Sequence, residues 1–146
     1  MTKVTVPNDI FLPEVARMVA DGMSVTLRGK GNSMFPFIKG GRDSVVLQKA
    51  ASLRKGDIVL AKTTDERFVL HRIIGIEEDH ITLMGDGNLI GTEQSTKKDV
   101  LAKAVKIIRN GCYIDIDDIK EQRKAVLWYK LRPMRRWLLA IYRRVA

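Results

Sequence analysis

The sequence predicts a mainly β, antiparallel domain with one helix near its amino-terminal end. Short runs rich in Val, Ile and Leu recur along the 146-residue chain, and turn signals built from Gly, Asp and Asn separate them. Many short strands joined by turns favour an antiparallel β domain. The expected strands cover residues 2–6, 24–28, 43–47, 57–61, 68–76, 81–84, 100–108 and 112–116.

The one helix of this domain is expected at residues 11–20. Four apolar residues of the segment share a helical face, Pro13 fits within the first turn, and Asp21-Gly22 ends the segment. Apolar residues with this helical spacing usually pack in the core of a protein. We therefore expect the helix to pack against the sheet; a surface that guides substrate is the alternative.

Two strands have features that bear on function. Residues 24–28 alternate as Ser-Val-Thr-Leu-Arg, which predicts a strand with one buried face leading into a turn at Ser33. Residues 68–76 form a long apolar run that contains His71. Residues 85–98 are expected to be irregular because they are too polar for the core, and Asn110-Gly111 is a strong hairpin signal.

Composition and motifs argue against several classes of protein: those that depend on disulfides, metals or bound phosphates, and those that cross a membrane. A chain with 45% hydrophobic residues can bury one core, and a lone cysteine, Cys112, rules out an internal disulfide. No cluster of metal ligands and no phosphate-binding loop is recognisable, so neither a metal nor a cofactor is expected. Residues 1–13 lack the features of a signal peptide, and no apolar run reaches the roughly 18 residues that a bilayer requires.

Three segments carry candidate chemistry. Ser33 lies in a turn bounded by Gly31 and Pro36, where a serine that only forms the turn is the alternative reading. His71 is the histidine with strongly apolar neighbours, and histidine is the commonest base for activating a hydroxyl nucleophile. Asp86 follows a short apolar strand and offers a carboxylate that can orient an imidazole.

The order and the flanks of these segments carry a resemblance to a known family. The four blocks are Gly-Asn-Ser-Met-Phe-Pro at 31–36, Arg-Lys-Gly-Asp-Ile-Val-Leu at 54–60, Leu-His-Arg-Ile-Ile at 70–74 and Met-Gly-Asp-Gly-Asn at 84–88. This arrangement resembles the signal peptidase I family of serine peptidases and, more distantly, the self-cleaving SOS-repressor peptidases of the same clan. The resemblance implies a partly coiled β-sheet, a Ser33 nucleophile and a His71 general base, as in the subgroup that uses histidine instead of lysine.

The oxyanion hole and the acidic residue depart from the family pattern. Bacterial signal peptidases carry a hydroxyl side chain where this chain has Gly31, so the hole would consist of the Ser33 backbone N–H and the Asn32 amide. The aspartate expected after the fourth block aligns with Thr92, and Glu93 follows it. The carboxylate partner of His71 is therefore Asp86 or Glu93.

The substrate implied by the resemblance is an extended peptide with small side chains near the scissile bond. Met34 and Phe35 would form an apolar wall for it, although core packing explains these two residues as well. We expect a serine endopeptidase that cleaves a peptide or precursor protein in trans. The alternative is a non-catalytic peptide-binding module on the same fold.

The carboxyl-terminal residues form a second unit, so that we expect a peptidase-like domain at 1–118 and a helical tail at 119–146. Residues 120–146 contain nine basic residues and one acidic residue, a net charge of +8 out of +9 for the whole chain. Apolar residues recur there at steps of three and four, as in a basic amphipathic helix that lies in a membrane interface. The proposed membrane-binding residues are Trp128, Arg132, Arg136, Trp137 and Arg143.

Two other roles remain open for this tail. The apolar stripe could pack on the β domain or on a partner protein, and nucleic-acid binding is the least favoured because it does not explain the stripe. Without a translocation signal, we expect a cytoplasmic protein, held at the inner face of the cytoplasmic membrane if the tail binds lipid.

Overall fold

A computed structural model describes residues 3–6, 12–28, 43–86, 91–109 and 111–116, together with residues 124, 127, 128, 130, 131, 134 and 137–141. The elements are β1 (Lys3–Val6), α1 (Leu12–Ala20), β2 (Ser24–Arg28), β3 (Ser44–Gln48), β4 (Ile58–Lys62), β5 (Phe68–Glu77), β6 (His80–Met84), β7 (Glu93–Thr96), the short 3-10 helix η1 (Lys97–Asp99), β8 (Val100–Arg109) and β9 (Cys112–Asp115).

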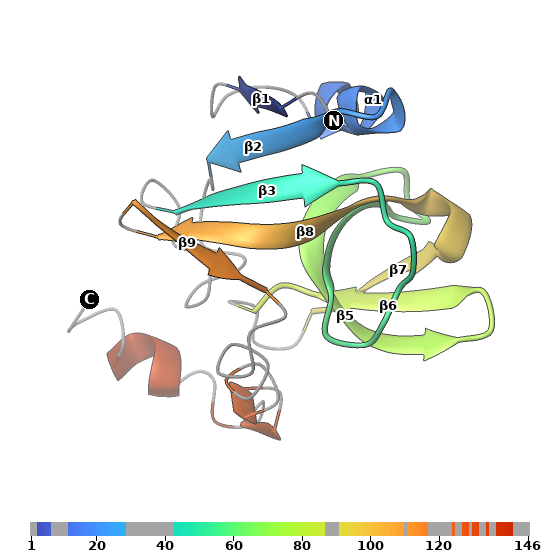
Figure 1. Ribbon diagram of the computed structural model, residues 1–146. Helices are drawn as coiled ribbons and strands as arrows, with labels where there is room; N and C mark the ends of the chain where they lie inside the picture. Colours follow the sequence, from blue (N-terminus) through green and yellow to red (C-terminus); the bar gives the residue numbers. More distant parts are fainter. Residues whose placement is uncertain are drawn as a thin grey trace.

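Among the described residues, nine strands form one sheet in the order β1-β2-β3-β8-β4-β5-β6-β7, with β9 added to β8. Only the β1–β2 pair in this sheet is parallel. The sheet curls, so that β5, β6 and β7 lie below and across the line of β2, β3 and β8, while α1 lies beside β2 (Figure 1). The predicted mainly antiparallel, partly coiled β-sheet with one amino-terminal helix is therefore confirmed.

Strand β4 separates two cores because both of its faces are buried. Ile58 and Leu60 belong to a cluster that α1 covers through Val15 and Val19. Val59 and Ala61 point to the opposite face of the sheet and pack inside the curl. The buried residues of this inner core are Val59, Ala61, Ile73, Ile81 and Leu83. A strand buried on both faces is expected to have a continuous apolar sequence, and Ile-Val-Leu-Ala fits.

Irregular pairing accompanies the curl of the sheet. The register shifts between Val46 and Leu47 where β3 meets β8, and again between Leu60 and Ala61 where β4 meets β8. A third shift lies in β5, between Ile73 and Gly75. An extra residue on one strand bends it and increases its twist, so these shifts help the outer strands turn back on the inner ones.

Strand β7 differs from the sequence prediction, which expected residues 85–98 to be irregular. Its sequence is Glu-Gln-Ser-Thr, without an apolar residue to reveal a strand. Antiparallel bonds to β6 form it, and the buried Ser95 hydroxyl donates to the Lys62 carbonyl at 2.7 Å. Tertiary partners therefore stabilise a strand that local propensity does not favour.

The described residues of the carboxyl-terminal segment are largely helical. The Leu131 N–H bonds the Leu127 carbonyl at 3.0 Å, the Met134 N–H bonds the Leu131 carbonyl at 2.9 Å, and residues 137–141 are helical. Figure 1 shows this segment beyond β9, at the lower left of the view. None of the helices in the described part of the chain has the length and apolar character needed to cross a membrane.

Candidate active site

His71 lies near the centre of β5 and points into the core inside the curl. It pairs with Val59 on the neighbouring strand β4, and residues that pair directly on two neighbouring strands share a face of the sheet. Val59 and Ile73, two residues after His71, both belong to that inner core. His71 is 8% exposed, so its imidazole is largely removed from water.

Glu93 provides the carboxylate that contacts this imidazole. It is the first residue of β7, where it pairs with Leu83, another member of the inner core. Because the sheet curls, the Glu93 Oε1 atom lies 2.5 Å from the His71 Nδ1 atom, and both side chains are nine-tenths buried. An ionised carboxylate can only accept, so this contact places a proton on Nδ1 and leaves the lone pair of the neutral ring on Nε2.

Asp86 makes a different interaction. Both of its carboxylate oxygens accept from Arg72, at 2.8 Å from Nε and 2.7 Å from Nη2, and Asp86 is 2% exposed. Arg72 also donates to the Gly56 carbonyl at 2.9 Å. Of the two carboxylates that the sequence left open, the structure thus places Glu93 against His71 and Asp86 against Arg72.

The alternation of side chains along β5 explains this division. His71 and Arg72 are consecutive, so they point to opposite faces of the strand. Arg72 pairs with Met84 on β6, and Asp86 follows Met84 by two residues. Asp86 is therefore positioned for the guanidinium, whereas Glu93 approaches from β7 on the imidazole side.

The turn at residues 54–57, which leads into β4, is bonded to β5 beside the site. The Gly56 N–H donates to the Ile73 carbonyl at 2.8 Å, and the Ile73 N–H donates to the Asp57 carbonyl at 2.7 Å. The Asp57 carboxylate accepts from the Arg54 N–H at 2.7 Å and lies 3.4 Å from the Lys103 Nζ atom. The Arg-Lys-Gly-Asp block thus fixes the start of β4 against the strand that carries His71.

Seven of the predicted site residues lie outside the described residues. They are Asn32, Ser33, Met34 and Phe35 of the catalytic segment and Arg132, Arg136 and Arg143 of the tail. The chain leaves the described part after Arg28 and returns at Asp43. Arg28 and Ser44 are register partners on β2 and β3, so the segment that contains Ser33 connects two neighbouring strands at one end of the sheet.

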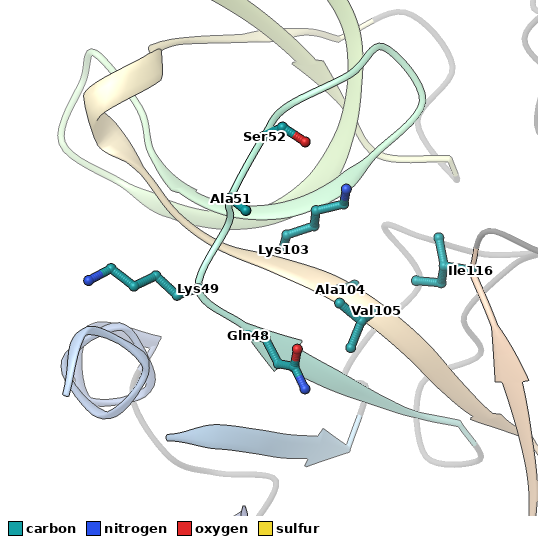
Figure 2. A pocket seen from close by; sticks show the side chains of 8 residues that line it. All are labelled: Gln48, Lys49, Ala51, Ser52, Lys103, Ala104, Val105 and Ile116. Carbon is teal, nitrogen blue, oxygen red and sulfur yellow. The ribbon is translucent and has the colours of Figure 1, made fainter. Parts of the chain in front are cut away.

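A separate pocket of about 210 Å³ lies between the β3–β4 connection and β8. Figure 2 shows Lys103 and Ser52 among its lining side chains, with Ile116 on the side of β9. The side chain of Lys103 is 16% exposed and faces the buried Asp57. Neither His71 nor Glu93 lines this pocket. The described residues also contain no group of three or more His, Cys, Asp or Glu side chains arranged for a metal.

Comparison with protein families gives a match to the family described as Peptidase S24-like, over residues 2–109. The chain belongs to this family. The match extends over the blocks at 31–36, 54–60, 70–74 and 84–88 and includes Glu93. The resemblance to this superfamily of serine peptidases is thus confirmed, while the finer assignment to signal peptidase I stays a prediction. No curated protein matches the chain.

The sequence analysis named no partner for Arg72 and assigned Trp128 to a membrane interface. The signal for Arg72 was a cation inside a strongly apolar run, which requires a buried anion nearby. Trp128 is half-buried, and its indole N–H donates to the Asp86 carbonyl at 2.8 Å, so this residue contacts the β domain. The same backbone turn therefore contacts both β5 and the carboxyl-terminal segment.

Proposed function

We propose that this member of the Peptidase S24-like family is a serine endopeptidase of the signal-peptidase-like type that cleaves a peptide or precursor protein in trans. Ser33 is the nucleophile, His71 the general base and Glu93 the carboxylate that orients the imidazole. The observation that carries the proposal is the buried contact of 2.5 Å between His71 Nδ1 and Glu93 Oε1, within a family of serine peptidases.

The burial of this pair supports a catalytic role. A carboxylate removed from water loses hydration, and the loss is offset by a short bond to a proton donor. In the same low-dielectric surroundings, Glu93 stabilises the imidazolium more strongly than it would in water. A histidine held in this way is a better-oriented base than a solvated one.

The proposed reaction has two steps. In the first, His71 Nε2 takes the proton of the Ser33 hydroxyl as its oxygen attacks the scissile carbonyl, and the imidazolium then protonates the leaving amine. The Ser33 backbone N–H and the Asn32 side-chain amide stabilise the oxyanion. In the second step, His71 activates a water molecule that hydrolyses the acyl-enzyme and frees Ser33.

The test is cleavage of a defined peptide mixture by the purified chain. A proteome-derived peptide library is incubated with the protein, and new amino termini are identified by mass spectrometry. We expect a set of cleavage sites that disappears in Ser33→Ala and in His71→Ala. The matched control is Ser52→Ala, which removes an exposed serine from the β3–β4 connection and should leave the set unchanged.

Two outcomes would refute the proposal. Identical cleavage by the wild-type protein and Ser33→Ala would exclude Ser33 as nucleophile, and a folded wild-type protein that cuts no peptide in the library would favour the binding module. Action in trans has its own test, because a self-cleaving chain shortens on incubation. We expect the intact mass of the purified protein to stay constant while added peptides are cut.

A further inference from the structure

Four large apolar side chains of the carboxyl-terminal segment are exposed to solvent. The exposed fractions are 58% for Leu127, 52% for Met134, 70% for Trp137 and 61% for Ile141. In the described part of the chain, the other large apolar side chain with comparable exposure is Tyr113, at 69% on β9. Exposed apolar residues are common one at a time, but a group of four in one segment suggests an interaction surface.

The spacing of these four residues is that of one face of a helix. They are separated by seven, three and four positions, which are the spacings of a single stripe on a helix. In the described residues, the Leu131 N–H bonds the Leu127 carbonyl as in a helical turn, and residues 137–141 are helical. We call Leu127, Met134, Trp137 and Ile141 the exposed stripe.

Other side chains of the segment are not exposed. Leu139 is 3% exposed, although it lies within the same helical turn as the highly exposed Trp137. Trp128, next to Leu127, is half-buried and donates its indole N–H to the Asp86 carbonyl. Trp128 therefore bonds the segment to the β domain, while the four apolar side chains of the exposed stripe face solvent.

The charge of the segment identifies the chemistry of its partner. Residues 120–146 have a net charge of +8, whereas the rest of the chain has about +1 of the total of +9. An apolar stripe within a strongly cationic segment matches a bilayer with anionic headgroups, which attracts the charges and accepts the apolar side chains. Self-association through the stripe would bring two segments of charge +8 together, and their repulsion opposes it.

We propose that the exposed stripe is a docking face for an anionic lipid bilayer. Leu127, Met134, Trp137 and Ile141 enter the interface, while Trp128 holds the segment to the β domain. The exposed stripe then attaches the peptidase domain to the membrane surface. This proposal concerns binding only, and it does not depend on the assignment of Ser33 or His71.

The two tryptophans of the chain, Trp128 and Trp137, provide an internal test. Trp128→Phe leaves Trp137 as the fluorescent reporter, and Trp137→Phe leaves Trp128. On addition of phosphatidylcholine vesicles that contain phosphatidylglycerol, the emission of the Trp128→Phe protein should shift to shorter wavelength. The Trp137→Phe protein should change little, because its remaining indole faces the β domain. The opposite pattern would overturn the proposed orientation.

Vesicle flotation with the full-length chain measures the contribution of the stripe. The variant Trp137→Ser/Ile141→Ser keeps every charge, and we expect its partition coefficient onto phosphatidylglycerol vesicles to fall at least about tenfold. Tyr113→Ser is the matched control, since it removes an equally exposed apolar side chain outside the segment. Circular dichroism confirms that both variants fold.

Three results would contradict membrane docking. Equal binding by the wild-type protein and Trp137→Ser/Ile141→Ser would show that charge alone holds the protein to the vesicles. Equal binding to pure phosphatidylcholine would remove the role of anionic lipid. A wild-type dimer in light scattering that becomes monomeric in the double variant would assign the stripe to a second copy. In each case the library cleavage assay, which contains no lipid, still reports on the peptidase proposal.

Discussion

His71 on β5 and Glu93 on β7 meet across the curl of the sheet, with Nδ1 and Oε1 2.5 Å apart. Strand β6 lies between these two strands in the sheet order. The contact therefore depends on the curl, because on a flat sheet two intervening strand spacings of about 4.8 Å each would separate side chains on β5 and β7. The architecture of the fold thus creates the candidate catalytic pair.

The first prediction concerns this pair. In Glu93→Gln, the side-chain amide can donate to Nδ1 and favour the tautomer with its proton on Nε2, which is the wrong form for a base. We expect kcat/KM for the library-derived peptides to fall by about 10²–10⁴-fold. Nitrogen NMR of the imidazole should show Nδ1 protonated in the wild-type protein and a changed tautomer ratio in the variant. Glu77→Gln, an exposed carboxylate at the end of β5, is the control.

The NMR measurement also separates catalysis from structure. A wild-type imidazole with its proton on Nε2 would contradict the proposed geometry regardless of substrate. Unchanged kcat/KM in a folded Glu93→Gln protein would show that Glu93 only positions β7.

The second prediction concerns Arg72 and Asp86. Asp86→Ala leaves the guanidinium of Arg72 buried without its two carboxylate bonds, so the free energy of unfolding should fall by about 3–5 kcal/mol. The double variant Arg72→Met/Asp86→Leu removes both charges and should recover much of this loss. Asp65→Ala, which breaks an exposed pair with Arg67, should lower that free energy far less than Asp86→Ala does. Urea denaturation measures all three.

The double variant decides the interpretation. If it is as unstable as Asp86→Ala, the cost comes from lost packing in the turn and not from an uncompensated charge.

The strands with apolar runs could be predicted from the sequence, because burial on one or both faces leaves a pattern in the residue order. Strand β4 reads Ile-Val-Leu-Ala and β2 alternates, and both were expected close to their observed bounds. Strand β7 could not be predicted, since Glu-Gln-Ser-Thr gains its burial from neighbours distant in the sequence. Local pattern is informative only where local residues supply the burial.

The site was predicted less completely for the same reason. His71 stood out as a histidine with strongly apolar neighbours that could serve as a base, but the sequence left Asp86 and Glu93 as alternatives for its partner. The choice between them depends on which face of β5 each carboxylate reaches, and that follows from the register and the curl. The contact of Trp128 with Asp86 depends on how the carboxyl-terminal segment docks, which no local pattern encodes.

The third prediction concerns the turn between β4 and β5. The Thr63 hydroxyl and, as a second cause, the Arg67 side chain donate to the Asp65 carboxylate. Together they hold the pKa of Asp65 below its ordinary value of 3.8. A lowered folded-state pKa stabilises the fold above the unfolded-state pKa, and this contribution is lost as the pH falls through the folded-state pKa. Carbon NMR titration should therefore give Asp65 a midpoint below 3.8.

Two variants rank the causes of this shift. Thr63→Val should move the Asp65 midpoint toward 3.8 by more than Arg67→Gln, because the hydroxyl bond is the larger cause. A larger movement in Arg67→Gln would instead make the guanidinium the dominant partner.

The last prediction compares two leucines that differ in burial. Leu60 is fully buried beneath α1, so Leu60→Ala loses apolar contact and leaves a cavity, and the free energy of unfolding should fall by about 2–5 kcal/mol. Leu127 is 58% exposed, and Leu127→Ala should change that free energy by no more than about 0.5 kcal/mol. Vesicle binding should show the reverse order, with Leu127→Ala weakening it and Leu60→Ala leaving it intact at temperatures where the protein is folded. A large loss of stability in Leu127→Ala would mean that the exposed stripe contributes to the fold itself, and the docking face would have to be reassigned.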